Sequence, residues 1–471
     1  MRSRKSQSQQ KTLSLFDEDD FVEDRVKPES KRSVLRDYPA QTEEPIRVQI
    51  VSDLMEQVTS SHNLRNALKR VEQNKGAGGI DGMMVNDLRP FLMRAWPSIK
   101  RSLLDGSYRP QSVKRVEIPK PTGGTRLLGI PTVLDRLIQQ AILQVLTPIF
   151  DPHFSPRSFG FRPGRRGHGA VRMAREFVLE GHAWVVDIDL EKFFDRVHHD
   201  ILMARVARRV SDKSVLRLIR QFLESGIMID GVVTASTEGT PQGGPLSPLL
   251  SNIVLHDLDT ELERRGHKFV RYADDCNIYV RSRRSGERVK ASVTSFLKER
   301  LRLQVNESKS AVDRPWKRKF LGFSLLTQGR RIRLAPTSVQ RVKDKIRNLT
   351  QRSKSISMLE RIRQLNQYLG GWVGYFALAE TPSIFKELDE WLRRRLRMCQ
   401  WKQWKRTRTR VRELRALGLK ELDVWEAAGS RKSYWRISRT PSLHKGLCNA
   451  YWANHGLRSI AVRYHEVRNA W

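Results

Sequence analysis

The order of hydrophobic and polar positions along the chain outlines several structural elements. Two β-prone runs, residues 268–270 and 277–280, are separated by a short polar stretch, which predicts two strands joined by a turn. Residues 184–188 read as an apolar strand that runs into acidic residues and then, at Phe193, into the apolar start of a helix. A Gly/Pro turn at residues 240–245 opens another apolar helix. The pattern therefore indicates a fold that mixes strands and helices.

Two adjacent aspartates, Asp274 and Asp275, occupy the turn between the two β-prone runs. Aspartate is common in turns, so an acidic hairpin tip would explain the pair without any chemistry. A further carboxylate upstream favours a metal site, because nucleotidyl transfer uses two divalent ions about 3.5–4 Å apart that carboxylates from separate strands hold together. Mg²⁺ suits such a site, since it prefers oxygen ligands and shares its shell with substrate phosphates.

Two aspartates at the end of the strand predicted over residues 184–188 are candidates for the third carboxylate ligand. Asp187 and Asp189 alternate to the same face of a strand, so periodicity does not separate them. Here the chain resembles the reverse transcriptases, whose first catalytic aspartate is followed five residues later by a bulky residue that blocks a ribose 2′-hydroxyl. Counting from Asp189 gives Phe194, whereas Asp187 gives Lys192. The resemblance thus assigns Asp189 to the metals and Phe194 to sugar discrimination, adds the backbone carbonyl of Leu190 as a metal ligand, and leaves Asp187 as a structural acid.

Two more blocks strengthen this resemblance. The Gly/Pro turn is similar to the family's Pro-Gln-Gly block, which implies that Gln242 and Gly243 lie beside the incoming nucleotide and the template. Upstream, residues 116–126 predict a hairpin. Its Lys120 and Arg126 match family positions that grip the triphosphate, Arg with a planar fork and Lys as a point charge.

The last two polymerase blocks follow downstream in the expected order. Residues 305–310 match the first of them, which assigns Lys309 to nucleotide binding. Residues 320–323 match the second, which holds the primer strand in the family. Because all blocks occur in order between residues 116 and 323, an accidental match does not explain them.

The flanking sequence narrows the resemblance to one branch of the family. Residues 53–83 look like the amino-terminal extension of group II intron-encoded and related non-retroviral enzymes, which retroviral enzymes lack. Residues 365–376 and 391–406 are similar to the maturase domain, the thumb of these enzymes. The resemblance covers roughly residues 50–470.

Cysteine spacing refines the expectation further. Many relatives carry a terminal HNH nuclease with paired zinc-ligand cysteines. The three cysteines of this chain, Cys276, Cys399 and Cys448, are isolated and form no pair spaced for a zinc site. The chain therefore looks most like the proteins of class C group II introns, and we expect no HNH nuclease in it.

Charge points independently to a polyanionic partner. The formal net charge is +36 over 471 residues. Residues 311–471 hold 36 Lys and Arg against 12 Asp and Glu, so two thirds of the excess lies in the last third of the chain. Tryptophans are interleaved there, and we expect them to form helix core. The cations exceed what solubility needs, and we assign to nucleic-acid binding Arg393, Arg394, Arg395, Arg397, Lys402, Lys405 and Arg406.

The predicted fold class is α+β, a right-hand polymerase with fingers, a palm built on a mixed or antiparallel sheet, a helical thumb and a small basic C-terminal domain. The boundaries follow from the blocks and from composition. We expect a mobile N-terminal tail at 1–45, an N-terminal extension with fingers at 46–180, the palm at 181–325, the thumb or maturase domain at 326–425, and a nucleic-acid-binding segment at 426–471.

The expected function is that of an RNA-directed DNA polymerase that uses two Mg²⁺ ions, with Mn²⁺ as a substitute. The resemblance implies that it also binds a group II intron RNA, promotes splicing and takes part in retrohoming. Its partners would be intron RNA, an RNA template with a DNA primer, dNTPs and a DNA target, with the protein a monomer or dimer in a ribonucleoprotein. No apolar run of membrane-spanning length or secretory leader is visible, so we expect a cytoplasmic protein associated with RNA and the nucleoid.

Two alternatives stay open at this point. The chain could be a maturase that only binds RNA, although three mutually repelling acids have no use in an idle site. It could also be a domesticated reverse transcriptase that serves DNA repair or phage defence without an intron.

Overall fold

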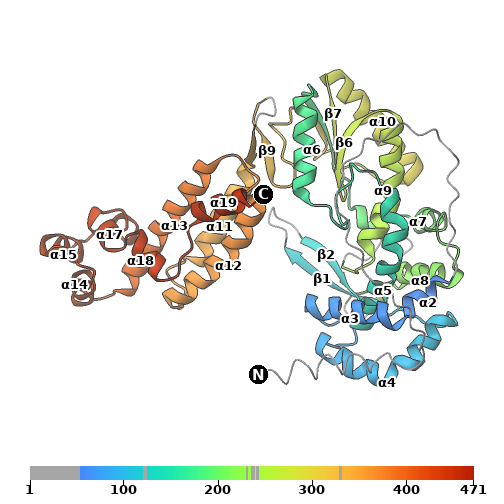
Figure 1. Cartoon of the computed structure of the whole chain (residues 1–471), viewed down its shortest axis with the longest axis horizontal. Helices are drawn as coiled ribbons and strands as arrows, with labels where there is room; N and C mark the ends of the chain where they lie inside the picture. The colour runs from blue at the N-terminus through green and yellow to red at the C-terminus, as the bar shows by residue number, and fades with distance from the viewer. Residues whose placement is uncertain are drawn as a thin grey trace, which may run out of the picture. The chain divides into compact units, whose positions relative to one another are not determined.

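The computed structural model describes residues 53–119, 125–229, 232–234, 239, 243–327 and 331–470. The predictions for residues 1–45, for Lys120 and for Gln242 lie outside these residues. The chain divides into two compact units (Figure 1). The first contains the described parts of Met1–Arg166, Val186–Ile278 and Arg284–Ala311, and the second contains those of Gly167–Val185, Tyr279–Arg283 and Val312–Trp471.

Helices open the first unit. The short helix α2 (Leu54–Thr59) and the helices α3 (Ser61–Asn74) and α4 (Val85–Leu104) contact α5 (Val133–Phe150), because each buries an apolar stripe. Ser60 caps α3 by accepting a hydrogen bond from the Asn63 amide. A 3₁₀ turn, η1 (Asp151–His153), follows α5.

A four-stranded sheet contains the predicted basic hairpin. Its strands are β1 (Val113–Pro119), β2 (Thr125–Ile130), β4 (Ile227–Ile229) and β5 (Val232–Thr234), in the order β2-β1-β4-β5. β1 and β2 are antiparallel, with Ile118 opposite Arg126. The hairpin predicted over residues 116–126 is therefore present.

A second four-stranded sheet has the order β6-β7-β3-β8. Its strands are β3 (Trp184–Ile188), β6 (Lys268–Tyr272), β7 (Asp275–Val280) and β8 (Ala311–Asp313). Figure 1 shows helices α9 (Ser247–Arg264) and α10 (Arg283–Leu301) beside β6 and β7. The three strands and the apolar helix predicted from the sequence around the aspartates are all present, and the α+β class is confirmed.

One predicted helix start is wrong. Residues Phe193–Asp195 form only a 3₁₀ turn, η2, and the helix α7 (His199–Val206) begins further along the chain. Lys192 has a left-handed backbone (φ 47°) and Arg196 leaves the helical region (φ −121°), so helical geometry cannot run through this segment. Helix α8 (Lys213–Glu224) follows, capped by Asp212, whose other carboxylate oxygen accepts from the amide of Met55.

The second unit is mostly helical. It holds α6 (Gly167–Leu179), the antiparallel pair β9 (Phe323–Leu325) and β10 (Ile332–Leu334), and the long helices α11 (Pro336–Leu349), α12 (Met358–Phe376) and α13 (Pro382–Gln403). Shorter helices complete it: α14 (Thr407–Ala416), α15 (Glu421–Ala428), α16 (Tyr434–Ile437), α17 (Pro441–Gly446), α18 (Asn449–Asn454) and α19 (Ile460–Asn469).

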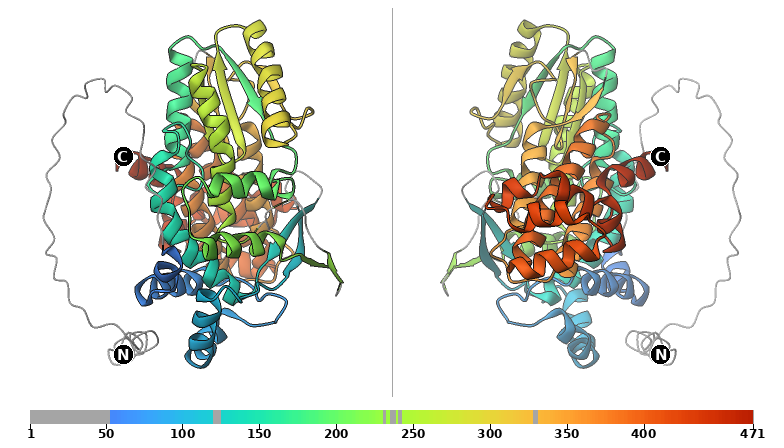
Figure 2. Two further views of the ribbon diagram at one scale, coloured as in Figure 1. Left: turned by 90° about the vertical axis from the view of Figure 1, so that its right-hand side faces the viewer. Right: turned by 90° about the vertical axis from the view of Figure 1, so that its left-hand side faces the viewer.

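The last helix returns to the middle of this unit. α19 contacts both α12 and α13, and the right view of Figure 2 shows the orange and red helices packed against one another. Tyr464 of α19 stacks on Phe385 of α13, with ring centroids 4.2 Å apart. The end of the predicted C-terminal segment therefore shares its core with the predicted thumb. Among the described helices, none is long and apolar enough to cross a bilayer.

Candidate functional site

The three predicted acidic ligands lie at the ends of strands of the second sheet. Asp189 directly follows β3, Asp275 is the first residue of β7, and Asp274 lies in the turn between β6 and β7. β3 and β7 are hydrogen-bonded neighbours. Asp275 is exposed, while Asp189 and Asp274 are half-buried. The fold thus brings the two acidic blocks, about 85 residues apart in sequence, to adjacent strands.

The backbone of Asp189 is held by the segment that contains the predicted block at residues 305–310. The Asp189 amide donates to Ser310 Oγ at 3.0 Å, and the Asn306 amide donates to the Asp189 carbonyl at 2.8 Å. Glu191 donates to the Gln304 carbonyl at 2.8 Å, which completes an antiparallel bridge centred on Leu190. These bonds use the backbones of Asp189 and Glu191, so the Leu190 carbonyl takes no part in them.

The Asp189 carboxylate has a cationic neighbour. Lys309 Nζ lies 2.9 Å from Asp189 Oδ2, on a lysine side chain that is 65% exposed. Across the described residues, no group of three or more His, Cys, Asp or Glu side chains is arranged to hold a metal ion. The structure therefore places the predicted ligands on neighbouring strands without gathering them into one cluster. The donor set itself fits Mg²⁺, because all three side chains offer hard carboxylate oxygens.

Asp187, the competing acid, also faces this region. Ile188 is buried between the half-buried Asp187 and Asp189, as expected for alternation along a strand. Burial raises the pKa of the Cys276 thiol in β7, and the negative charges of Asp259, Asp187 and Asp275 raise it further. Asp187 is therefore close enough to β7 to act on it electrostatically, as a structural acid beside the turn would.

The two phenylalanines of the 3₁₀ turn differ in exposure. Phe193 is core, at 2% exposed, whereas Phe194 is partly open to solvent. Their rings meet edge to face, with centroids 5.2 Å apart. Only Phe194 can therefore present a ring face to a ligand, which agrees with the choice made from spacing. Its role in sugar discrimination stays a prediction.

Glycines before and within the Pro-Gln-Gly block allow close backbone contacts. A Cβ on Gly239 would lie 3.1 Å from the Phe194 carbonyl oxygen, and Gly239 has a φ of +97°. Gly243 has a φ of +135°, and a Cβ there would lie 2.5 Å from the carbonyl oxygen of Gly129. Gly243, which was predicted to lie beside the nucleotide, therefore packs against β2 of the β1–β2 hairpin in this structure.

The arginines of α13 correct one expectation. Arg397 is 4% exposed, donates to the Ser438 carbonyl at 2.9 Å and lies 2.9 Å from His444 Nε2. Burial, together with the positive charges of Arg393 and Arg394, lowers the pKa of Arg397 to about 10. Such a guanidinium is not available to phosphate, so the assignment of Arg397 to a solvated binding surface is wrong.

The three neighbouring arginines also make internal contacts. Arg393 pairs with Asp389 at 2.7 Å. Arg394 lies over the Trp435 ring at 3.7 Å, and Arg395 donates to Thr350 Oγ1 at 2.5 Å. Arg393 thus pairs within α13, whereas Arg394 reaches α16 and Arg395 reaches the residue that follows α11.

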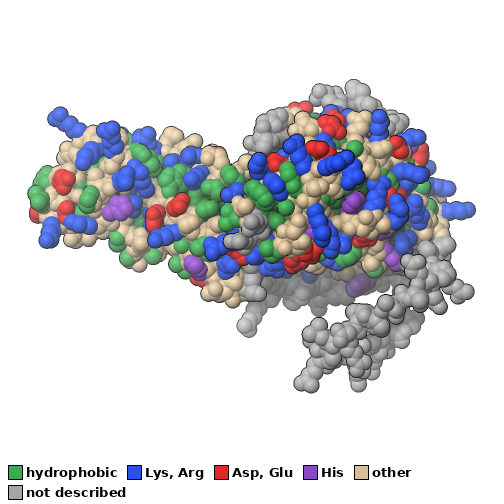
Figure 3. All heavy atoms as spheres, turned by 90° about the horizontal axis from the view of Figure 1, so that it is seen from above, with side chains coloured by type: hydrophobic (Ala, Val, Ile, Leu, Met, Phe, Trp, Pro, Cys, Tyr) green, Lys and Arg blue, Asp and Glu red, His purple; other side chains and the backbone are tan. Residues whose placement is uncertain are grey.

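The remaining predicted cations are exposed. Lys402, Lys405 and Arg406 lie at and just after the end of α13, with their side chains in solvent. Figure 3 shows Lys and Arg side chains spread widely over the face that it draws. These three residues therefore stay predicted nucleic-acid contacts. The side chain of Arg126, like Lys120 and Gln242, lies outside what the structure describes.

Sequence reasoning missed two residues that support the acids. Ser310 and Arg271 both lie inside the motifs that were singled out, but neither was assigned a role. Arg271 is completely buried below the aspartate turn. A charged residue beside a tyrosine in a strand gives no sequence signal of burial, because most arginines are exposed.

Comparisons with known proteins agree with this architecture. Residues 118–325 match the family model described as reverse transcriptase (RNA-dependent DNA polymerase). Residues 339–418 match the model described as group II intron, maturase-specific domain. The first stretch contains all three acids and the second contains α12, α13 and α14. The fold and the acidic strand ends thus define a polymerase palm followed by a maturase-type thumb.

Over these two stretches, which together make up more than half of it, the chain is similar to the group II intron-encoded reverse transcriptases and maturases. It is 38% identical to Protein YkfC of Escherichia coli strain K12, over 48% of this chain and 60% of that protein. It is also 38% identical to the group II intron-encoded protein LtrA of Lactococcus lactis subsp. cremoris, over 44% of this chain and 34% of that protein. The matched regions thus span 60% or less of the length of these relatives.

Among solved structures, one similar chain belongs to a partial Cas6-RT-Cas1–Cas2 complex. The sequence identity is 26%, with 52% of this chain and 42% of that chain covered and a TM-score of 0.35.

Proposed function

We propose that the protein is an RNA-directed DNA polymerase whose Asp189, Asp274 and Asp275 hold two divalent ions, Mg²⁺ or, as a substitute, Mn²⁺. One observation carries the proposal: Asp189 and the Asp274–Asp275 turn lie at the ends of hydrogen-bonded neighbouring strands. Its substrates would be dNTPs and an RNA template paired with a DNA primer.

The proposal gives separate roles to the acidic residues, which would hold the metal ions, and to Lys309. Bound divalent ions would supply the positive charge that favours ionisation of the primer 3′-hydroxyl and departure of pyrophosphate. Asp189, Asp274 and Asp275 would hold them, with the Leu190 carbonyl as a further ligand. Lys309 must release Asp189 for this, and its exposure lets the ammonium turn to the triphosphate instead.

The other predicted contacts position the nucleotide. Lys120 and Arg126 would grip the triphosphate, and Gln242 and Gly243 would lie beside the base pair that is being formed. The partly exposed ring of Phe194 would exclude a ribose 2′-hydroxyl by occupying its space.

We also propose that the protein is a maturase that binds a group II intron RNA, promotes its splicing and joins it in retrohoming to a DNA target, as a monomer or dimer in a ribonucleoprotein. The maturase-specific match over 339–418 and the exposed Lys402, Lys405 and Arg406 support this. Assignment to class C is part of the proposal. An intron RNA of another class around the coding sequence would contradict it.

The test is primer extension by the purified protein on an RNA template with a DNA primer, dNTPs and Mg²⁺. We expect processive DNA synthesis that is lost in Asp274→Asn. Asp257→Asn is the matched control, because Asp257 lies on α9 and pairs with Arg205 at 3.0 Å, outside the acidic turn. A folded wild-type protein that binds intron RNA but extends no primer would leave only the RNA-binding alternative.

A further inference from the structure

The aspartate turn rests on a buried ion pair. Arg271, the fourth residue of β6, is 0% exposed, as is its partner Asp259 on α9. Arg271 Nε donates to Asp259 Oδ1 at 2.7 Å, and Nη2 donates to Asp259 Oδ2 at 2.6 Å. Two parallel bonds between planar groups fix orientation as well as distance.

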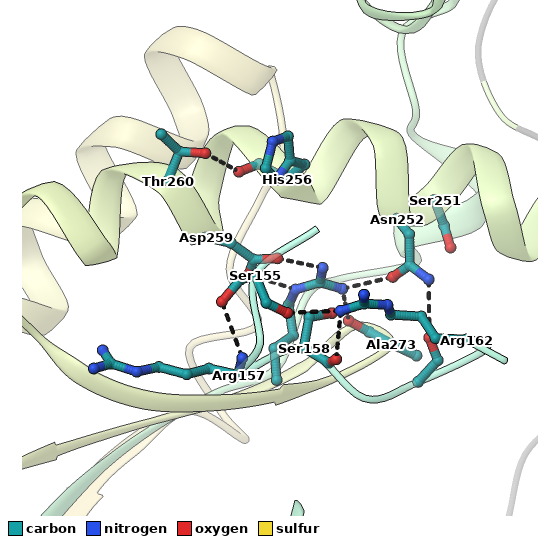
Figure 4. Close-up of polar contacts among 12 residues, drawn as sticks. Ser155, Arg157, Ser158, Arg162, Ser251, Asn252, His256, Asp259, Thr260 and Ala273 are labelled. Atoms are coloured by element: carbon teal, nitrogen blue, oxygen red, sulfur yellow. Dashed lines mark hydrogen bonds and ion pairs between the residues drawn. The ribbon is translucent and has the colours of Figure 1, made fainter. Parts of the chain in front are cut away.

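The remaining guanidinium nitrogen reaches the turn itself. Arg271 Nη1 donates at 2.9 Å both to Asn252 Oδ1 and to the carbonyl of Ala273. Asn252 lies two helical turns before Asp259 on α9 and donates to the Gly160 carbonyl at 2.8 Å. Figure 4 shows Asn252 and Asp259 projecting from one face of that helix toward Ala273 and the segment with Ser155 and Ser158. The side chain of Arg271 therefore connects α9, β6 and the turn that follows β6.

Ala273 needs such support. Its φ of 58° lies in the left-handed region, which an L residue with a Cβ adopts only when its surroundings impose it. Gly160 packs directly on this residue, since a Cβ on Gly160 would collide with the Ala273 amide nitrogen. The Phe159 amide also donates to the Arg271 carbonyl at 2.9 Å. Packing from one side and hydrogen bonding from the other thus fix the backbone one residue before Asp274.

The charge of Arg271 is retained in this environment. Burial alone would lower the pKa of Arg271, but Asp259 more than offsets this and the pKa is raised overall. A buried ion pair adds little net stability compared with apolar residues, whereas it specifies a unique geometry well when all its hydrogen bonds are made. The network is therefore better explained as a means of fixing the geometry of the turn than as a source of folding stability.

We propose that Arg271, Asp259 and Asn252 are positioning residues that hold the left-handed turn at Ala273, and through it set where Asp274 and Asp275 present their carboxylates. The inference rests on the proposed function of these acids. None of the three positioning residues needs to touch substrate or metal, because each acts through the backbone of the turn.

The test uses Arg271→Lys, which keeps the charge but cannot bond Asp259 and Ala273 together, and Asn252→Ala, which removes one support and leaves the ion pair. Mn²⁺ binding is measured by electron paramagnetic resonance, alongside primer extension and thermal unfolding. We expect Mn²⁺ affinity and kcat to fall by roughly tenfold or more in Arg271→Lys and by less in Asn252→Ala, with KM for the template–primer unchanged. Asp257→Asn, on the same helix α9 as Asn252 and Asp259, should change neither Mn²⁺ affinity nor kcat.

Two results would overturn the proposal: wild-type Mn²⁺ affinity in a folded Arg271→Lys protein, or an equal loss in Asp257→Asn. If Arg271→Lys does not fold, the Asn252→Ala result decides in the same way. Mn²⁺ binding is read without turnover, so a wild-type protein that binds Mn²⁺ but extends no primer would count against the proposed function and not against the positioning role.

A separate observation concerns one tryptophan. Of the five tryptophans between residues 391 and 435, Trp401 and Trp404 are buried and Trp391 and Trp435 are half-buried. Trp425 on α15 is 56% exposed, and Leu422, one turn before it, is 84% exposed. The opposite face of α15 is buried through Val424 and Ala427. The helix thus presents an apolar outer face that its own unit does not cover.

A cavity adjoins this ring. Its volume is about 370 Å³, and its lining includes Trp425, Ser430, Lys432, Thr440 and Ser442. The Arg415 guanidinium lies 5.8 Å from the Trp425 ring centroid. An aromatic face, hydroxyl groups and a lysine are together the groups that hold an unpaired base by stacking, edge hydrogen bonds and phosphate attraction.

We infer that Trp425 and the cavity beside it bind an unpaired nucleobase of a single-stranded nucleic acid. The inference deepens the proposed nucleic-acid binding of this region and rests on it. RNA and DNA share the chemistry that is recognised here, so the experiment separates them.

The test measures binding of single-stranded RNA, single-stranded DNA and a duplex of the same sequence by fluorescence anisotropy. Trp425→Ala should weaken single-strand binding roughly tenfold, while Trp425→Phe keeps most of it and Val462→Ala, the control at an exposed apolar residue of α19, is unchanged. A loss confined to RNA or to DNA identifies the strand. Unchanged single-strand binding, or an equal loss for the duplex, would overturn the site. Primer extension by Trp425→Ala then shows separately whether the polymerase itself is intact.

Discussion

The β6–β7 turn and helix α13 are both dense in charge, and they use that charge in opposite ways. At the turn, Asp274 and Asp275 are accessible while the arginine beneath them is completely buried. On α13, Arg397 is buried and Arg393, Arg394 and Arg395 contact other parts of their own unit. Among the cations assigned to nucleic-acid binding, Lys402 at the end of that helix and Lys405 and Arg406 just after it are the exposed ones.

The difference shows that a run of like charges is not by itself a binding surface. At the turn, the structure includes a buried ion pair and a left-handed backbone at Ala273, which we propose keep the acids in place for a ligand. On α13, the guanidinium groups satisfy carbonyls and stack on rings, which is a packing role. Substitution should therefore destroy chemistry at the turn and stability on α13.

The largest expected effect is at the acids. Asp274→Asn and Asp189→Asn should lower primer extension on the order of 1,000-fold, because each would remove a proposed metal ligand, while intron RNA binding stays near wild type. Asp187→Asn should be much milder, since Asp187 is assigned a structural role. Steady-state kinetics and filter binding on the same preparations give both values. An equal loss at Asp187 would reverse the choice between the two strand-end acids.

Arg397→Met should give the largest loss of stability on α13. It leaves the buried Ser438 carbonyl without its donor, so unfolding free energy should fall by about 2 kcal/mol. Lys402→Met, on the same helix but exposed, should change it by less than about 0.5 kcal/mol. Urea denaturation of both variants measures this. If Arg397→Met weakens RNA binding without loss of stability, the packing role is wrong.

Phe194→Ala should admit ribonucleotides. Loss of the partly exposed ring opens room for a 2′-hydroxyl, so discrimination against rNTPs should fall by roughly ten- to a hundredfold in kcat/KM. Phe193→Leu, a change in the buried neighbour, should leave discrimination intact. Single-nucleotide incorporation with dNTP and rNTP gives the ratio, and unchanged discrimination in Phe194→Ala would move the steric role elsewhere.

Replacing Lys402, Lys405 and Arg406 with alanine should have a smaller, salt-dependent effect. Each lost phosphate contact lowers the slope of log affinity against log salt by roughly 0.7–0.9. The slope for intron RNA should fall while stability is unchanged, which is the reverse of the pattern at Arg397. RNA binding across a salt series provides the slope. A slope that does not move would mean that these cations face solvent only.

The smallest effect concerns acid pH. Burial lowers the pKa of His199, although its contact with the Gly239 carbonyl opposes this. The unfolded chain then takes up the proton at higher pH than the folded protein. Stability is therefore fully present above the unfolded pKa of about 6.5 and falls as pH drops through it. Urea denaturation at pH 7.5 and 5.5 should show a lower unfolding free energy at pH 5.5. In His199→Gln the difference between the two pH values should be smaller, by less than about 1 kcal/mol. An unaltered pH dependence in His199→Gln would contradict it.

Much of the palm could be predicted from the sequence. The strands around Asp189 and Asp274, the hairpin at Arg126 and the helix at Ser247 have patterns that local physics decides. The start of α7 could not, because the left-handed turn at Lys192 leaves no trace in the apolar pattern. The burial of Arg271 and Arg397 depends on partners at Asp259 and Ser438 that are distant in sequence. No local signal distinguishes these arginines from solvated ones.

Asp189 and the Asp274–Asp275 turn are proposed to hold divalent ions together during DNA synthesis. The most direct measurement is anomalous diffraction from crystals of the protein with an RNA–DNA primer–template, a non-hydrolysable dNTP and Mn²⁺. We expect two anomalous peaks between Asp189 and the turn, with Lys309 moved from Asp189 to the triphosphate. An absence of anomalous signal there, with Lys309 still paired to Asp189 while the nucleotide is bound, would contradict the account.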